Sequence, residues 1–171
     1  VNLNSYQQTH MLTSGLLPAG QVGFVKLTPE SGKKILAKTS QYFYKTNGTV
    51  SSAYTSNARK LLTGDLYSSY NTFLAQSNWI KLFNFDSEMA VVNLDVYNSD
   101  GSLKGSRSFN VAAKRGMDLN LNSDLSLGLA NNKYGMMRIR SSKTSFAADN
   151  LRYNVSMDGS YLDIGKVLPF R

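Results

Sequence analysis

Lys133–Ile139 reads KYGMMRI, and Gln21–Leu27 reads QVGFVKL. The two stretches match position by position: glycine is third in both, a cation is sixth, an aliphatic residue is seventh, and a leucine stands four residues upstream. Self-similarity at a fixed spacing is the signature of a repeated structural unit. The fold of the whole chain therefore depends on what this repeated stretch forms and on how far each copy extends.

Alternation within the repeated stretch assigns its two faces. Met137 and Ile139 fall on one side of an extended strand, whereas Arg138 and Arg140 fall on the other. The apolar side is expected to face a core, and the shared glycine is expected to mark a close backbone approach or a bulge. The same parity in the first copy places Val25 and Leu27 inward and Lys26 outward.

The repeat extends well beyond the glycine stretch. The expected turns Asn47-Gly48-Thr49 and Asp158-Gly159-Ser160 lie 111 residues apart, so one module spans roughly 111 residues. On this count residues 61–171 form one complete module, and residues 1–60 form only the C-terminal half of another. Half a sandwich would expose apolar surface and unpaired strand edges. Upstream chain, a neighbouring subunit, or extension of the complete module's sheets would each supply what is missing.

Period-two alternation dominates the complete module. Val92, Leu94 and Val96 alternate with polar or outward residues, and Asp100-Gly101 then supplies a tight hairpin turn. Counting similar segments gives about seven short strands after Trp79. We therefore expect an all-β, immunoglobulin-like antiparallel β-sandwich.

Composition narrows the class of protein. The chain has 171 residues, no cysteine, a single histidine and a net charge of +8. A disulfide framework and a thiolate metal site are thereby excluded, while the positive charge suits a polyanionic partner or simply a solvated surface. No apolar run approaches the roughly 20 residues of a membrane-spanning helix. The start of the sequence shows neither an initiator methionine nor a signal peptide, so we expect a processed or excised piece of a longer polypeptide.

Catalytic chemistry finds little support in the sequence. A serine–histidine–aspartate triad would have to use His10, and Asp86 with Glu88 shows no pattern of an acid–base pair. We expect no enzyme activity, no cofactor and no metal. Calcium remains an alternative at a module end, because hard cations bind oxygen ligands; its candidate ligands are Asp95, Asn98, Asp100 and Asp118.

Aromatic and basic side chains are the better candidates for partner contacts. Exposed aromatic rings stack on sugar rings or fill a partner's pocket, and outward cations attract anionic glycans. For each of them, a position in the core or on a solvated face is the alternative explanation. The candidate contact residues are Lys26, Tyr44, Tyr54, Arg138 and Arg140.

The strand and turn pattern of residues 75–171 resembles the adhesion-type, immunoglobulin-like β-sandwich repeats of secreted bacterial proteins. The resemblance lies in the apolar strand from Trp79, the Val92–Tyr97 strand, the Asp-Gly hairpin and the returning Phe109–Val111 strand. It implies a structural or adhesive module of a fibre, sheath or adhesin, either secreted, at the cell surface or in the periplasm. Its partners would be neighbouring modules or copies of itself, with a glycan or other polyanion as a further partner and no specific nucleic acid. The alternative is a carbohydrate- or polyanion-binding module appended to a secreted enzyme.

Overall fold

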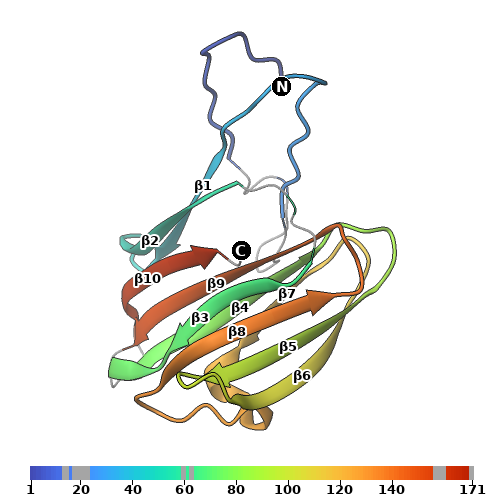
Figure 1. The fold of residues 1–171 in the computed structure, drawn as a ribbon. Coiled ribbons are helices and arrows are strands. Elements are labelled where there is room, and N and C mark those ends of the chain that lie inside the picture. The colour runs from blue at the N-terminus through green and yellow to red at the C-terminus, as the bar shows by residue number, and fades with distance from the viewer. Residues whose placement is uncertain (13–15, 17–23, 59–60, 62–63, 156–160, 170–171) are drawn as a thin grey trace.

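A computed structural model describes residues 1–12, 16, 24–58, 61, 64–155 and 161–169, with the backbone alone described at 43, 51, 52, 54, 125, 153, 155 and 161–169. The structure is all-β, and its sheets are antiparallel (Figure 1). The strands are β1 (Lys38–Tyr44), β2 (Val50–Asn57), β3 (Leu66–Asn71), β4 (Gln76–Asn84), β5 (Ala90–Asn98), β6 (Leu103–Val111), β7 (Gly116–Asn120), β8 (Tyr134–Ser141), β9 (Phe146–Val155) and β10 (Tyr161–Pro169). Three short 3₁₀ turns connect them: η1 (Phe73–Ala75), η2 (Leu121–Ser123) and η3 (Leu125–Leu127).

The main body is a sandwich of two four-stranded sheets. Their strand orders are β3-β8-β5-β6 and β10-β9-β4-β7. The pairs β5–β6, β4–β7 and β3–β8 are nested along the sequence, whereas β9 pairs with both β10 and β4. Immunoglobulin domains instead pair their first strand with their second. The antiparallel, sandwich-like architecture is confirmed, whereas the immunoglobulin-like arrangement is not.

The core lies between the two sheets and follows the alternation of the sequence. Val92, Leu94 and Val96 of β5 are buried, as predicted, and they face Ile80 and Leu82 of β4 in one hydrophobic cluster. Removing apolar side chains of this size from water is the main driving force for such packing. The strand segments predicted from Trp79 onward also form strands, seven of which lie between residues 76 and 169 of the described chain.

The two copies of the glycine stretch are not equivalent in the structure. In the second copy Met137 and Ile139 are buried within β8, as predicted. In the first copy residues 21–23 lie outside the described residues, and residues 24–27 form no strand. Val25 and Leu27 are exposed instead of inward, so the expected parity is wrong there. Residues 24–27 form no hydrogen-bonded pair with any described strand, so their side chains do not alternate between the two faces of a sheet.

The C-terminal hairpins of the two predicted copies agree better with each other than the glycine stretches do. In the β1–β2 hairpin Tyr42 pairs with Ala53, and in the β9–β10 hairpin Tyr153 pairs with Ile164. Both pairs are related by the spacing of 111 residues, so the two hairpins share one register near their turns, up to the irregularity between Ile164 and Val167. The division of the chain near residue 60 stays a prediction.

The N-terminal part of the chain lies against the β10-β9-β4-β7 sheet. Strand β2 runs beside β10, although β1 and β2 form a two-stranded sheet of their own (Figure 1). The ring of Phe24 packs edge-on against Phe85 at a centroid distance of 4.3 Å and against Phe83 at 6.1 Å. This aromatic contact anchors an otherwise irregular segment on the outer side of β4.

Candidate functional site

Side chains from the opposite sheet form hydrogen bonds with backbone groups at the edge of β3. Asn78 Oδ1 accepts a hydrogen bond from the Asn71 amide at 3.1 Å, and Asn78 Nδ2 donates to the Asn71 carbonyl at 2.8 Å. Asn150 Nδ2 and Arg152 Nη2 donate to the Ser69 carbonyl at 2.6 and 2.8 Å. These bonds satisfy backbone groups that an open edge would offer to another chain.

Arg152 is a cation held without a carboxylate partner among the described residues. Its Nη2 also donates to Ser69 Oγ at 2.6 Å, while its Nε is buried without a hydrogen-bond partner in the described structure. Burial disfavours the charged form and lowers the pKa of the guanidinium. The residue contributes to closing the β3 edge and not to an exposed cationic surface.

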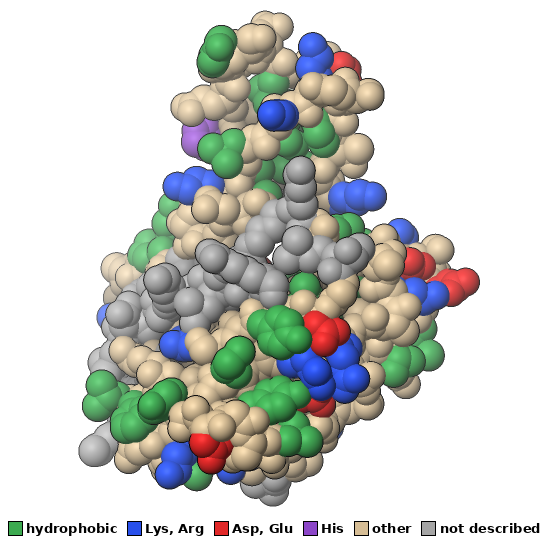
Figure 2. All heavy atoms as spheres, viewed as in Figure 1, with side chains coloured by type: hydrophobic (Ala, Val, Ile, Leu, Met, Phe, Trp, Pro, Cys, Tyr) green, Lys and Arg blue, Asp and Glu red, His purple; other side chains and the backbone are tan. Residues whose placement is uncertain are grey.

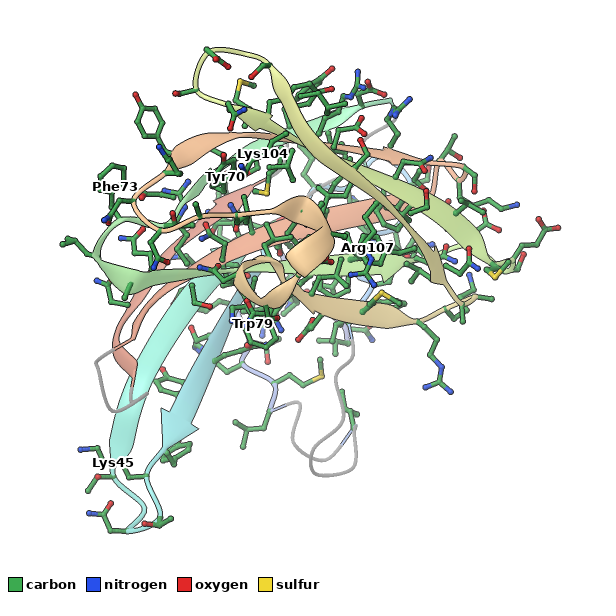
Figure 3. All side chains as sticks on the ribbon, turned by 90° about the horizontal axis from the view of Figure 1, so that it is seen from below. Lys45, Tyr70, Phe73, Trp79, Lys104 and Arg107 are labelled. Atoms are coloured by element: carbon green, nitrogen blue, oxygen red, sulfur yellow. The ribbon has the colours of Figure 1, made fainter. Side chains whose placement is uncertain are left out.

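The edge of β6 is covered by the 3₁₀ turns that follow β7. A Cβ on Gly105 would lie 3.2 Å from the Leu127 Cα, so β6 and η3 are in close backbone contact there. Arg107 forms an ion pair with Asp124, and Figure 3 shows Arg107 beside these turns. A shallow polar depression lies at this place, lined by Ser106, Arg107, Ser108, Ser123, Asp124 and Ser126.

The β1–β2 hairpin, in contrast, projects from the sandwich. Figure 3 shows Lys45 at its tip, away from the body of the molecule. The predicted turn is confirmed: Asn47 Oδ1 accepts from the Thr49 amide at 3.1 Å, and Gly48 has a φ of 81°. A non-glycine residue would be strained at this angle. Every side chain of β1 that the structure describes is exposed, on both faces of the strand.

Two of the candidate contact residues belong to this hairpin. Tyr44 lies at the end of β1 and is 64% exposed. Tyr42, on the same face of β1, is 57% exposed. Tyr54 lies in β2 opposite Gln41, and its side chain is outside the described residues. The hairpin therefore presents tyrosine rings to solvent along β1.

Two further candidates, Arg138 and Arg140, lie on the outer face of the β3-β8-β5-β6 sheet, as their parity predicted. Asp95 Oδ2 accepts hydrogen bonds from Arg138 Nη2 at 2.7 Å and from Arg140 Nη2 at 3.0 Å. Asp95 Oδ1 accepts from Ser106 Oγ at 2.6 Å. The arginines are neighbours across one carboxylate, which their spacing in the sequence did not reveal.

The protonation of this cluster follows from its contacts. Burial alone would raise the pKa of Asp95, but the hydrogen bonds from Ser106 and Arg138 and the charges of both arginines outweigh it and lower that pKa. The hydrogen bond to Asp95 is the main cause of the raised pKa of Arg138. The cluster is therefore charged on both sides near neutral pH, and its own carboxylate neutralises part of its positive charge.

Tyrosine rings lie on the same face of the sheet as the cluster. Tyr97 lies below the Arg138 guanidinium, with 5.7 Å between the guanidinium carbon and the ring centroid. Tyr67 is directly opposite Arg138 in the β3–β8 pairing, and Tyr134 contacts Phe73 at a centroid distance of 6.3 Å. Figure 2 shows hydrophobic side chains gathered on this side of the molecule next to basic and acidic ones. No local sequence pattern indicates that Tyr67, Tyr97 and Tyr134 share this face, because they lie on three different strands.

The remaining candidates are not brought together. Lys26 is exposed in the irregular segment, and no described contact joins it to Arg138 or Arg140. Among the calcium candidates, Asp95 faces the two arginines, whereas Asp118 lies in the other sheet and pairs with Lys81 at 3.1 Å. Asp100 Oδ1 accepts from the Ser102 amide within its own turn. In the described part of the chain, no three acidic or histidine side chains form a metal-binding group.

Comparison with protein-family models, with curated proteins and with solved structures found no match. Among the described residues, no helix has the length and apolar character needed to cross a bilayer.

Proposed function

We propose that this chain is a non-catalytic structural or adhesive module of a bacterial extracellular assembly, acting through strand-edge and apolar-face contacts. The observation that carries the proposal is the β1–β2 hairpin, which projects from the sandwich with both faces of β1 exposed. An isolated two-stranded hairpin is only marginally stable in water. A neighbour that covers it would therefore stabilise the hairpin and bind the chain in the same step.

The distribution of exposed apolar side chains supports the same function. The sandwich has a buried apolar cluster, whereas no described side chain of residues 1–58 is buried and many of the apolar ones lie in solvent. Surfaces of this kind mark sites of association. The exposed residues of this part are Val1, Leu3, Tyr6, Met11, Leu12, Leu16, Val25, Leu27, Ile35, Leu36, Tyr42, Tyr44 and Val50.

Sedimentation of the full chain over a wide concentration range tests this function. Self-association that weakens when Tyr42 and Tyr44 are both changed to Ser supports it. The matched control is Tyr134→Ser with Met136→Ser on the sandwich face, which should leave association unchanged. A strict monomer that also binds no neighbouring module would contradict the proposal.

A carbohydrate- or polyanion-binding module appended to a secreted enzyme is the second candidate. It is favoured by the outer face of β8, where Tyr97 lies against the Arg138 guanidinium, Tyr67 is opposite Arg138, and Tyr134 lies further along the same strand. A glycan array and a heparin column at low salt test it, with Tyr134→Ala expected to weaken retention and Tyr42→Ala expected not to. If the natural chain binds no glycan on the array and is not retained on the heparin column, this candidate function is eliminated.

A further inference from the structure

We infer that β1 pairs edge to edge with β1 of a second copy of this chain, antiparallel and with full overlap. The two hairpins would then form one four-stranded sheet. This inference rests on the proposed function, and it names the edge, the partner and the register.

The edges of the sandwich leave few alternatives. Asn78, Asn150 and Arg152 bond to Ser69 and Asn71 at the β3 edge, η3 contacts the β6 edge at Gly105, and β2 runs beside β10. Strand β7 has five residues, all of them partly buried. Strand β1 has seven residues and, among the described strands, pairs with β2 alone. Its described side chains are exposed on both faces, and no other described strand pairs with it.

The side chains of β1 suit pairing with themselves. Of its seven residues only Lys38 is charged, and charge is what usually protects a strand edge. Full antiparallel overlap centres the pair on Gln41 and places Lys38 opposite Tyr44 of the second copy. A lysine beside a tyrosine ring gains a cation–π contact.

Charge also selects the direction of pairing. In the antiparallel arrangement the two Lys38 side chains stand about 20 Å apart, six residues along the strand. In a parallel arrangement in register they would stand next to each other, and like charges directly opposite destabilise a sheet. The second copy therefore approaches in the antiparallel sense, related by a two-fold axis.

Single cysteines test the register, because the natural chain has none. With Gln41→Cys the two-fold axis brings the Cα atoms to about 5 Å, within the range for a disulfide. With Thr39→Cys the two cysteines are four residues out of register and about 13 Å apart, too far to bridge. We expect disulfide-linked dimers to form at least about tenfold faster for Gln41→Cys than for Thr39→Cys under the same mild oxidation.

A second variant tests the edge without a cross-link. Ser40→Lys with Tyr42→Lys places lysines opposite each other in the paired strands, and we expect the dimer dissociation constant to rise at least about tenfold. The matched control is Tyr134→Lys with Met136→Lys on the sandwich face, which should leave that constant unchanged.

The outcomes separate this inference from the function on which it rests. If the full chain associates in sedimentation but both cysteine variants cross-link equally fast, the β1 pairing is wrong while the proposed function stands. If the lysine pair on β1 has no larger effect than its control, the pairing is likewise wrong. If the chain stays monomeric at all concentrations and binds no neighbouring module, the β1 pairing and the proposed function are both wrong.

Discussion

Tyr70 and Gly135 face each other across the β3–β8 pairing, and the tyrosine ring fills the space that a side chain at Gly135 would need. A Cβ at Gly135 would lie 2.8 Å from Tyr70 Cε1 and 2.0 Å from the Tyr97 carbonyl oxygen. Only glycine fits at position 135 without a shift of its neighbours. The close backbone approach predicted from the sequence is therefore confirmed at this position.

Gly135→Ala should destabilise the sandwich by about 3 kcal/mol, because the clash includes a backbone atom that cannot rotate away. Urea unfolding followed by circular dichroism measures the change. Gly116→Ala is the matched control, since its Cβ would meet Phe83 Cδ1 at an ordinary 3.4 Å. Equal stability of the two variants would show that the sheet yields at Gly135.

Asn78→Ala should free backbone groups at the edge of β3. It leaves the amide and the carbonyl of Asn71 without their side-chain partner, at an expected cost of about 2–4 kcal/mol. Hydrogen exchange should accelerate at the Asn71 amide more than elsewhere in β3. Asn93→Ala, which removes an exposed bond to Ser108, should cost less than about 1 kcal/mol. An unchanged exchange rate at Asn71 would refute this role of Asn78.

Asp95→Asn should alter the acid stability of the fold. The folded-state pKa of Asp95 is lowered, so its contribution is present above the unfolded value of about 3.9 and is lost as pH falls through the folded pKa. We expect the variant to be less stable by about 2–3 kcal/mol at pH 7, and the difference to shrink below about pH 4.

Chemical unfolding at a series of pH values measures this dependence. Asp65→Asn is the control: Asp65 Oδ2 lies 3.7 Å from Arg138 Nη1 in a more exposed pair, and such pairs contribute less than about 1 kcal/mol. A difference between Asp95→Asn and the natural chain that stays constant from pH 7 to strongly acidic pH would contradict the assignment.

Phe24→Ala should release the N-terminal segment from the sandwich. The ring contacts with Phe83 and Phe85 are lost, and about 1–1.5 kcal/mol of docking free energy corresponds to roughly tenfold faster proteolysis within residues 1–58. Leu36→Ala, at a side chain that is 90% exposed, should leave the cleavage rate unchanged. Mass spectrometry of timed digests locates the cuts, and equal rates would show that the segment is held elsewhere.

The sequence predicts the faces of the strands better than their neighbours. Period two at Val92–Val96 places these side chains inward because burial repeats every second residue. The pairing of β8 with both β3 and β5 depends on contacts between distant segments, which no local pattern encodes. Strand β3 was not predicted, because Ser68 interrupts its apolar face between Leu66 and Tyr70.

For the candidate contact residues too, the sequence predicted the face of the strand but not the neighbouring residues. Parity correctly placed Arg138 and Arg140 on the outer face, yet their shared partner Asp95 lies on another strand and became visible only through the register. Lys26 was placed by analogy with Arg138, and that analogy fails because residues 24–27 have no sheet around them. A repeated motif predicts structure only where its neighbours are repeated too.

The side-chain hydrogen bonds at the β3 edge affect how large an assembly can grow, because they occupy backbone groups that a further strand would need. Sheets that remain open on two borders can add molecules without end, as in amyloid. If two copies pair through β1, a single companion saturates that strand edge, because the two-fold axis uses the same edge of both molecules at once. Longer filaments would then require a different contact surface, and Asn78, Asn150 and Arg152 would hinder the addition of a strand at the β3 edge.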